Sequence, residues 1–228
     1  HQVWAAERLA KSEYNNKFRK ITKRRPVTHA NRLWVMDGTP WHRYYTIDGK
    51  TWARINVYVI LDAFSWRVVG FHYSKTETST AVTGALRTAC LVTGYVPEVI
   101  QYDGGSANTS EVSQQAINAL AKYGMKARPG NARSKVIEPF FKHFNQKVLK
   151  WREGFSGNPF ARTDTAKVNT DHLRELVRSG GLPSGEQVVR ELIEDFEAWN
   201  QKIKFKGHIP AQRYEQSLQD SAQWQMPF

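Results

Sequence analysis

The stretch ARINVYVILDAFSWRVVGFHYS, residues 53–74, decides the fold class of this 228-residue chain. Its β-branched and aromatic residues predict two long strands with a short turn between them. RLWVMD, residues 32–37, predicts an earlier strand, and YYTIDGKTW, residues 44–52, contains Asp48-Gly49, a hairpin turn signal. Three strands that follow one another through tight turns predict an antiparallel meander.

Helices and strands alternate after residue 74. Residues 76–94 predict a helix with Thr78 or Ser79 as its N-cap and Gly94 as its stop. The remaining expected elements are a strand at 98–103, a helix at 109–124, a brief strand at 125–130, a helix at 134–153, a short helix at 172–177 and an amphipathic helix at 186–203. Because a strand that follows a helical crossover pairs in parallel, the sequence predicts an α/β fold with a five-stranded mixed sheet flanked by helices.

The expected organisation is one central domain with an extension at each end. Residues 1–31 are interpreted as a basic helical extension or linker, and residues 32–204 as the core, with a loop-rich insertion at about 154–185. Residues 205–228 have weak periodicity and are interpreted as a tail that leads towards an absent domain.

Positive charge dominates the composition, with 33 Lys and Arg against 21 Asp and Glu and a net charge of +12. Such an excess is typical of a protein that binds a polyanion, nucleic acid before membrane. In the run KFRKITKRR, Lys23, Arg24 and Arg25 are candidate phosphate contacts, with a solvated linker as the alternative. Cys90 alone cannot form an intrachain disulfide and no apolar run has the length of a membrane span, so we expect an intracellular protein.

Three acidic residues lie at the boundaries of expected elements. Asp37 ends, or nearly ends, the first strand, Asp103 ends the fourth, and Glu138 lies in the first turns of the next helix. Turn formation is the ordinary alternative for the two Asp residues, and a favourable place at a helix N-terminus is the alternative for Glu138. Strands one and four are expected parallel neighbours, so both Asp side chains would stand at the same edge of the sheet, where the helix can bring Glu138.

These three acids form a candidate metal site, because carboxylates gathered so closely repel one another and a divalent cation relieves the repulsion. Oxygen ligands favour Mg²⁺, with Mn²⁺ as a substitute, over Zn²⁺. Two such ions activate a nucleophile and stabilise the leaving oxygen in phosphodiester displacement. Asp62 also follows an apolar run, but its strand ends at the opposite edge, so we interpret it as structural. Trp41 is expected in the core.

The order Asp, Asp, Glu on strand one, strand four and the next helix resembles the catalytic core of the DDE transposase and retroviral integrase superfamily, which has an RNase H-like fold. Between Asp103 and Glu138 lie 34 residues, within that family's range. Three more stretches resemble segments of the family, LDAFSWRVVGF, PGNARSKVIEPFFKHFNQ and FEAWNQKIKFKGHIPAQRYEQS. The loop-rich insertion and the DGTPW segment look most like phage Mu-type and related bacterial transposases.

The resemblance implies a metal-dependent polynucleotidyl transferase, which nicks 3′ ends with water and then joins the freed 3′-OH to target DNA. Asp37, Asp103 and Glu138 would be its catalytic metal ligands, holding two Mg²⁺ ions when DNA is bound. The implied partners are double-stranded DNA, as transposon or phage ends and as target, and further copies of the chain. The expected location is the cytoplasm or nucleoid of a bacterium.

Four polar residues near Glu138 are candidate DNA contacts. Two of them follow Glu138 on the same helix, where integrases touch the DNA end, and two precede it in a loop that would hold phosphates. Ordinary polarity of a helix surface is the alternative for the first two. The four are Lys142, Asn145, Arg133 and Lys135.

Two other functions remain open. One is an RNase H-like nuclease that only hydrolyses, although such nucleases usually carry a fourth acid and often an Asp in place of the helical Glu. The other is a DNA-binding regulator that has kept the fold and lost the chemistry, against which the full set of three acids argues.

Overall fold

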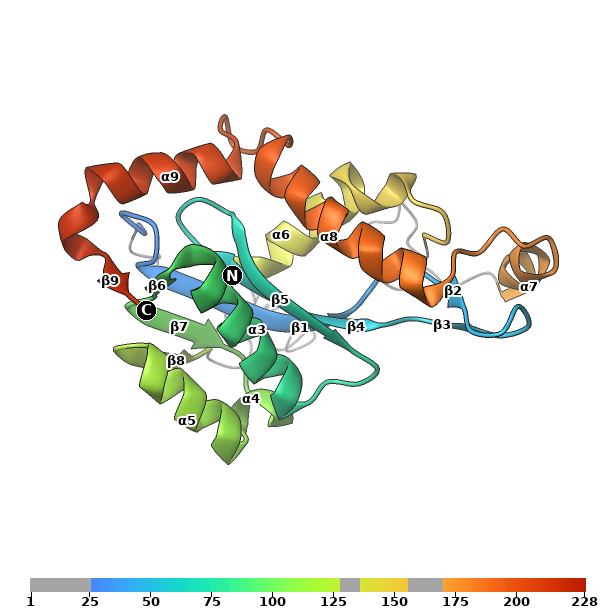
Figure 1. Ribbon diagram of the computed structural model, residues 1–228, viewed down its shortest axis with the longest axis horizontal. Helices are drawn as coiled ribbons and strands as arrows, with labels where there is room; N and C mark the ends of the chain where they lie inside the picture. Colours follow the sequence, from blue (N-terminus) through green and yellow to red (C-terminus); the bar gives the residue numbers. More distant parts are fainter. Residues whose placement is uncertain (1–25, 128–135, 156–169) are drawn as a thin grey trace, which may run out of the picture.

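A computed structural model describes residues 26–127, 136–155 and 170–228. Within these residues, five strands form the central sheet in the order β5–β4–β1–β7–β8 (Figure 1). The strands are β1 (Leu33–Pro40), β4 (Asn56–Asp62), β5 (Val68–Ser74), β7 (Val99–Tyr102) and β8 (Tyr123–Lys126). β4 pairs antiparallel with β1 and β5, whereas β7 pairs in parallel with β1 and β8. The mixed sheet expected from the sequence is therefore confirmed.

The side chains of β1 alternate between two hydrophobic cores, one on each face of the sheet. Val35 contributes to the first core together with Val59 of β4, and Trp34 and Met36 contribute to the second. All four side chains are at most 1% exposed. A strand buried on both faces belongs in the middle of a sheet covered by helices on both sides.

Three helices belong to the face of the second core: α3 (Ser79–Thr93), α4 (Ser106–Thr109) and α5 (Glu111–Leu120). α3 begins and ends where the sequence predicts. The Thr78 side chain accepts a hydrogen bond from the backbone N–H of Ala81, and Gly94 closes the helix with a φ of 73°. A glycine stops the helix at that point because the left-handed conformation is unfavourable for other residues.

The end of α5 corrects the expected helix at 109–124, because α5 stops at Leu120. Gly124 instead lies in β8, where it pairs with Ile100 of β7. A Cβ atom at Gly124 would meet the Ile117 side chain at 3.0 Å, so the glycine lets the strand lie close against α5. Strand pairing prevails over the helical pattern here, and the fifth strand starts earlier than expected.

The face of the first core is covered by α6 (Ile137–Lys147) and α8 (Gly185–Gln201), joined to the sheet by aromatic packing. Pro139 lies in the first turn of α6, as expected. The expected helix at 134–153 is shorter than predicted, because the chain leaves it at Val148 and forms a 3₁₀ turn, η2 (Leu149–Trp151). Trp41 packs in this core against Phe144 and Phe196, with its ring tilted to both, which confirms its interpretation as a core residue.

The C-terminal residues pack onto the domain despite their weak periodicity. They form α9 (Pro210–Asp220), a 3₁₀ turn, η3 (Ala222–Trp224), and β9 (Met226–Pro227), which pairs with β6 (Tyr95–Val96). Tyr214 of α9 is 1% exposed and donates its hydroxyl to Asn31 Oδ1 at 2.8 Å. At the end of α8, Asn200 both accepts from the backbone N–H of Val68 and donates to its carbonyl, which fastens the helix to β5.

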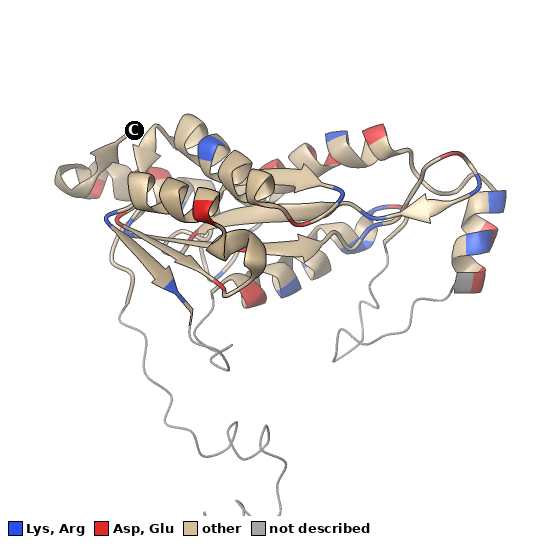
Figure 2. Ribbon diagram, turned by 90° about the horizontal axis from the view of Figure 1, so that it is seen from below, with Lys and Arg blue, Asp and Glu red and all other residues tan. Residues whose placement is uncertain are grey.

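A hairpin and a helix project beyond the sheet at one end of the molecule (Figure 1). The hairpin pairs β2 (Tyr45–Thr46) with β3 (Trp52–Ala53) through the expected Asp48-Gly49 turn, and Gly49 has a φ of 73°. Backbone hydrogen bonds from Thr51 and Lys50 lower the pKa of Asp48. The helix is α7 (Thr170–Arg178), which covers the short helix expected at 172–177. Figure 2 shows several Lys and Arg positions on this projecting part.

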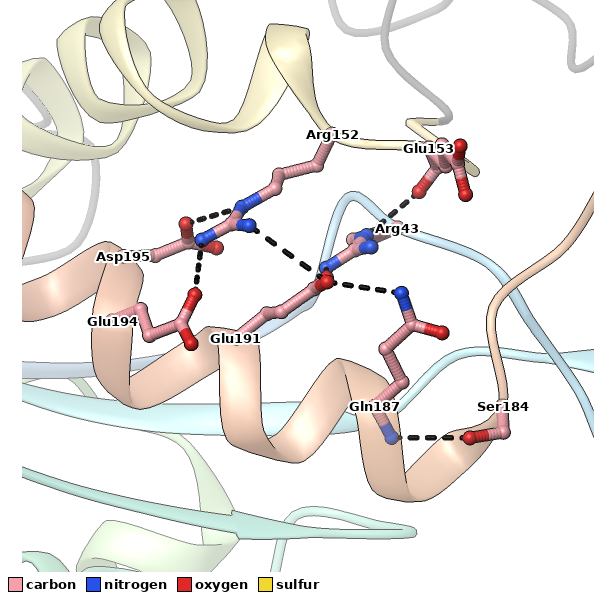
Figure 3. Close-up of polar contacts among 8 residues, drawn as sticks. All are labelled: Arg43, Arg152, Glu153, Ser184, Gln187, Glu191, Glu194 and Asp195. Atoms are coloured by element: carbon pink, nitrogen blue, oxygen red, sulfur yellow. Dashed lines mark hydrogen bonds and ion pairs between the residues drawn. The ribbon is translucent and has the colours of Figure 1, made fainter.

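A network of charged side chains ties the segment after β1 to η2 and α8 (Figure 3). Arg43 is 1% exposed, forms an ion pair with Glu191 and donates to the carbonyl of Glu153 at 2.7 Å. Arg152 donates to Asp195 at 2.7 Å and to Glu194 at 3.0 Å. The network joins the chain leaving β1 to the chain leaving α6, which are the two elements that carry Asp37 and Glu138.

Candidate active site

Asp37 lies within β1 rather than at its end. The strand continues to Pro40, and Asp37 pairs with Val59 of β4, which corrects the expected strand end. The correction has a simple cause, because Gly38, Thr39 and Pro40 stay in register with β4. Asp37 is half-buried, and strand alternation places it on the face of Val35, towards α6. Its Oδ1 accepts a hydrogen bond from the Gly38 N–H at 3.1 Å.

Asp103 follows β7 directly and stands level with Asp37. β1 and β7 pair in parallel, with Val35 opposite Gln101, and all their paired residues differ by 66 in number. Asp37 and Asp103 have the same offset, so the register brings them to the same edge of the sheet. This edge is the carboxyl end of the parallel strands, where ligands bind in open α/β sheets.

The carboxylate of Asp103 is held through one oxygen. Oδ1 accepts from the backbone N–H of Gly105 at 2.9 Å and from the Asn108 side chain at 2.6 Å. A Cβ atom at Gly105 would lie 3.0 Å from the same oxygen, so a glycine gives this carboxylate its room. Both hydrogen bonds that the described part of the chain gives to Asp103 arrive at Oδ1.

Tyr58 of β4 lies among the acidic side chains. Burial raises the pKa of its hydroxyl, and the charges of Asp37, Asp103 and Glu77 raise it further. An exposed carboxylate of Glu77, before α3, also stands beside the backbone of Gly38, where a Cβ atom would meet Glu77 Oε1 at 2.8 Å. Asp37 and Asp103 therefore share one negative electrostatic environment, with Glu77 at its border.

Glu138 occupies the first turn of α6 and is exposed. Ile137, Phe140 and Phe144 bury the opposite side of this helix in the first core, and α6 packs against β1. Residues 128–135, which lead into α6, lie outside the described residues. Within the part of the chain that the structure describes, no three His, Cys, Asp or Glu side chains gather closely enough to hold a metal ion. The three-acid metal site stays a prediction, although its oxygen donors are of the kind that Mg²⁺ binds.

Of the candidate DNA contacts, two lie in the described residues. Lys142 is exposed one turn beyond Glu138, and Asn145 is partly exposed on the next turn. Burial lowers the pKa of His143, which lies between them in the sequence, and so do the nearby charges of Lys147, Lys142 and Lys206. The other candidates, Arg133, Lys135, Lys23, Arg24 and Arg25, lie outside the described residues.

Asp62 has the structural surroundings expected of it. It is fully buried, accepts from the Asn31 N–H through Oδ2, and accepts from the N–H and hydroxyl of Ser65 through Oδ1. Burial raises its pKa, while the hydrogen bonds from Ser65 and Asn31 act in the opposite direction. In register it pairs with Trp34, near the start of β1 and three residues before Asp37.

Four residues of this edge were not singled out from the sequence: Tyr58, Glu77, Asn108 and Lys126. Tyr58 fits the apolar alternation of β4, and Glu77 looks like any acid at the start of a helix. Lys126 ends β8 level with Tyr102, and its Cε would lie 3.1 Å from a Cβ atom at Gly104. Folding alone brings Asn108 to Asp103, Lys126 to Gly104 and Glu77 to Gly38, so the spacing of these residues along the sequence gave no signal.

Comparison with known proteins agrees with this architecture. Residues 27–135 match the integrase core domain family, a region that includes Asp37 and Asp103 and stops before Glu138. No curated protein matches the sequence.

Three solved structures share the fold. A chain of the simian T-cell lymphotropic virus intasome in complex with PP2A regulatory subunit B56 gamma has 18% identity and a TM-score of 0.57, over 93% of this chain and 69% of that one. The BIV integrase catalytic core domain has 18% identity and a TM-score of 0.52, over 84% and 99%. The HTLV-2 integrase catalytic core domain in complex with magnesium, in its dimeric form, has 18% identity and a TM-score of 0.50, over 81% and 94%.

The fold is thus the RNase H-like fold of integrase catalytic cores. The family match covers slightly less than half of this chain, and the similarity to the solved integrases is one of fold. Among the described residues, no helix has the length and apolar character needed to cross a membrane.

Proposed function

We propose that this protein is the catalytic core of a DNA transposase or integrase, of the phage Mu-type and related bacterial group, acting in the cytoplasm or nucleoid of a bacterium. It would nick the 3′ ends of its element with water and then join each freed 3′-OH to target DNA. The observation that carries the proposal is the parallel pairing of β1 with β7, which aligns Asp37 and Asp103 at the carboxyl edge of the sheet. The integrase core domain match spans both residues.

In this proposal Asp37, Asp103 and Glu138 bind two Mg²⁺ ions when DNA is present, and Mn²⁺ can replace them. The bound ions would supply Lewis-acid chemistry, which makes a water or 3′-OH nucleophilic and stabilises the leaving oxygen. The three carboxylates fix where that chemistry happens relative to the scissile phosphate. Asp103 contributes Oδ2, since its Oδ1 is taken by Gly105 and Asn108.

The basic side chains would position the DNA. Lys142 and Asn145 follow Glu138 along α6 and would hold the end of the element. The remaining candidates would contact phosphates on either side of the cleavage point, and these are Arg133, Lys135, Lys23, Arg24 and Arg25. Strand transfer at two ends requires several copies of the chain on one DNA complex.

A nuclease that only hydrolyses is the second candidate, and Glu77 favours it. This acid stands beside Gly38, next to Asp37, and acts electrostatically on the same tyrosine as Asp37 and Asp103. A fourth acid of this kind is usual in hydrolytic enzymes of the fold. The two candidates differ in a product, because only a transposase or integrase forms a new joint between two DNA molecules.

The test uses duplexes that carry the ends of the DNA element encoding the protein, with labelled target DNA and Mg²⁺. We expect wild type to nick and join, and Asp37→Asn, Asp103→Asn and Glu138→Gln to lose both steps while still binding DNA. Glu186→Gln is the matched control, because Glu186 is an exposed acid in the first turn of α8. Nicking without joining would favour the nuclease, and joining by the three acid variants would refute the site.

A further inference from the structure

A buried polar pair, Tyr58 and Asn108, stands directly behind Asp103. Both side chains are 3% exposed, one on β4 and the other on α4. The Tyr58 hydroxyl donates a short hydrogen bond to Asn108 Oδ1, and Asn108 Nδ2 donates to Asp103 Oδ1 at 2.6 Å. A chain of two hydrogen bonds thus runs from the strand next to β1, through the Asn108 amide, to the carboxylate.

The chemistry of the two neighbours fixes the orientation of the Asn108 amide. A phenol at neutral pH donates its proton, whereas an ionised carboxylate only accepts. The amide must therefore turn its oxygen to Tyr58 and its NH₂ group to Asp103. An amide serves both neighbours because it carries an acceptor and a donor on one planar group, which no aliphatic or acidic side chain of that size does.

The backbone of Asn108 is fixed as firmly as its side chain. Gln114 Nε2 donates to the Asn108 carbonyl at 2.6 Å, and the Tyr102 hydroxyl donates to Gln114 Oε1 at 3.0 Å. The Asn108 N–H donates to the carbonyl of Gly105, whose own N–H holds Asp103 Oδ1. Asp103 therefore meets two donors that have little freedom to move.

We propose that Tyr58 and Asn108 are positioning residues, which lock Oδ1 of Asp103 so that Oδ2 faces the divalent cation. The inference rests on the proposed function, since it assumes that Asp103 is a metal ligand. Residues that orient the ligands of a metal commonly change its affinity when they are removed, because a carboxylate that rotates freely spends less time in the binding geometry.

A second Tyr–Asn pair in the protein provides a matched comparison. Tyr214 donates to Asn31 Oδ1 at 2.8 Å, and Asn31 donates its side-chain N–H to Gln225 at 2.8 Å. Tyr214 is 1% exposed and Asn31 4%. This pair has similar burial and also joins a tyrosine hydroxyl to an amide oxygen, but its amide ends on a neutral glutamine. The Asn31 oxygen also accepts a second hydrogen bond, from Trp34 Nε1 at 3.0 Å. Removing the Tyr214 hydroxyl therefore deletes a buried tyrosine–amide hydrogen bond, as removing the Tyr58 hydroxyl does, but without touching Asp103.

The experiment compares Tyr58→Phe, Asn108→Leu and Tyr214→Phe in the 228-residue chain. Mn²⁺ affinity is measured from the electron paramagnetic resonance signal of free Mn²⁺, and stability from urea unfolding. We expect both Tyr58→Phe and Tyr214→Phe to lose stability, while only Tyr58→Phe binds Mn²⁺ several-fold more weakly. Asn108→Leu should weaken Mn²⁺ binding by roughly tenfold to a hundredfold, the range usual for residues that orient metal ligands.

Equal Mn²⁺ affinity in Tyr58→Phe, Tyr214→Phe and wild type would overturn the inference, and so would a wild type that binds Mn²⁺ no better than Asp103→Asn. Tyr58→Phe keeps the ring and its packing, so the test stands even where Asn108→Leu fails to fold. The proposed function fails separately. A wild type that neither nicks nor joins DNA, but whose Mn²⁺ affinity depends on Tyr58 and Asn108, would refute the activity and support the positioning role.

Discussion

Asp62 and Asp103 look alike in the sequence and differ in the fold. Each follows a run of apolar residues that forms a strand, yet β4 is antiparallel to β1 and β7 is parallel to it. Asp62 therefore comes to the start of β1, fully buried, with both oxygens occupied by hydrogen bonds. Asp103 comes to the other edge, half-exposed, with its hydrogen bonds gathered on Oδ1. The direction of a strand, rather than the residues around the acid, separates the structural carboxylate from the candidate ligand.

The largest expected effect comes from making the same substitution at both positions. Asp103→Asn should reduce nicking and joining to the background of the assay, with little loss of stability, because one charged ligand is replaced by a neutral group. Asp62→Asn should cost about 2–4 kcal/mol in the free energy of unfolding, because its NH₂ group would face a backbone donor in a buried site. Activity assays and urea unfolding of both variants check this. Loss of activity in Asp62→Asn together with loss of stability in Asp103→Asn would contradict the roles given to the two acids.

A buried cation should behave like Asp62. Arg43→Ala removes the buried partner of Glu191 and should destabilise the protein by about 3 kcal/mol in urea unfolding. Arg174→Ala is the matched control, since its ion pair with Asp171 is exposed and worth at most about 0.5 kcal/mol. Equal losses in the two variants would contradict the structural role given to the network of Figure 3.

Asp62 should make the free energy of unfolding depend on pH. Because burial raises its pKa in the folded state, folding favours the protonated carboxyl group. Its contribution to stability is therefore complete at acid pH, below the unfolded pKa, and falls as the pH rises through the raised folded pKa. The stability difference between wild type and Asp62→Asn should accordingly shrink with rising pH in a series of urea titrations. A difference that grows with pH would show that the three hydrogen bonds outweigh burial.

The sequence predicted the sheet and its edge well, and its errors have physical causes. The strands at residues 53–74, the caps Thr78 and Gly94 and the Asp48-Gly49 turn are local features, set by side-chain shape and backbone freedom. The ends of β1 and α5 depend on neighbours far along the chain, because β4 keeps pairing with Gly38 to Pro40 and β7 draws Gly124 into a strand.

The surroundings of Asp103 were not predicted from the sequence. Asp37, Asp103 and Glu138 are recognisable by order and spacing, whereas Tyr58 and Asn108 are 50 residues apart and meet only in the folded sheet. Nothing in the local pattern marks Tyr58 as more than an apolar strand residue. Hydrogen bonds between residues so far apart produce no periodic pattern of residue types along the sequence, so a single sequence does not predict them.

DNA should approach only the edge of the sheet that carries Asp103. The basic residues of the N-terminal extension test this, and we expect them to have a moderate effect on DNA binding. Replacing Lys23, Arg24 and Arg25 by Gln should make the slope of log affinity against log salt concentration shallower by about 2–3 if all three contact phosphates. Replacing Lys50, Arg174 and Arg178 of the projecting part removes the same charge and serves as the control. An unchanged slope in the first variant would exclude the arm from the DNA contact.

The smallest effect is expected from two lysines at the opposite ends of β8. Lys126 lies at the edge of Asp103, and Lys122 immediately precedes β8 at the opposite edge, both exposed. Lys126→Gln should reduce the salt slope by about 1, and Lys122→Gln should leave it unchanged, because only the first charge lies beside the path of the DNA. Equal salt slopes of DNA binding for the two variants would show that DNA does not favour the edge of the sheet that carries Asp103.

The most direct test of the central claim is to locate a bound cation. Crystals of the protein grown with Mn²⁺ and a DNA end would give an anomalous scattering signal at the metal. We expect a Mn²⁺ ion about 2.1 Å from a carboxylate oxygen of Asp37 and from Oδ2 of Asp103, with Glu138 completing the site. A metal bound elsewhere, or one held by Asp62 in place of Asp103, would contradict it.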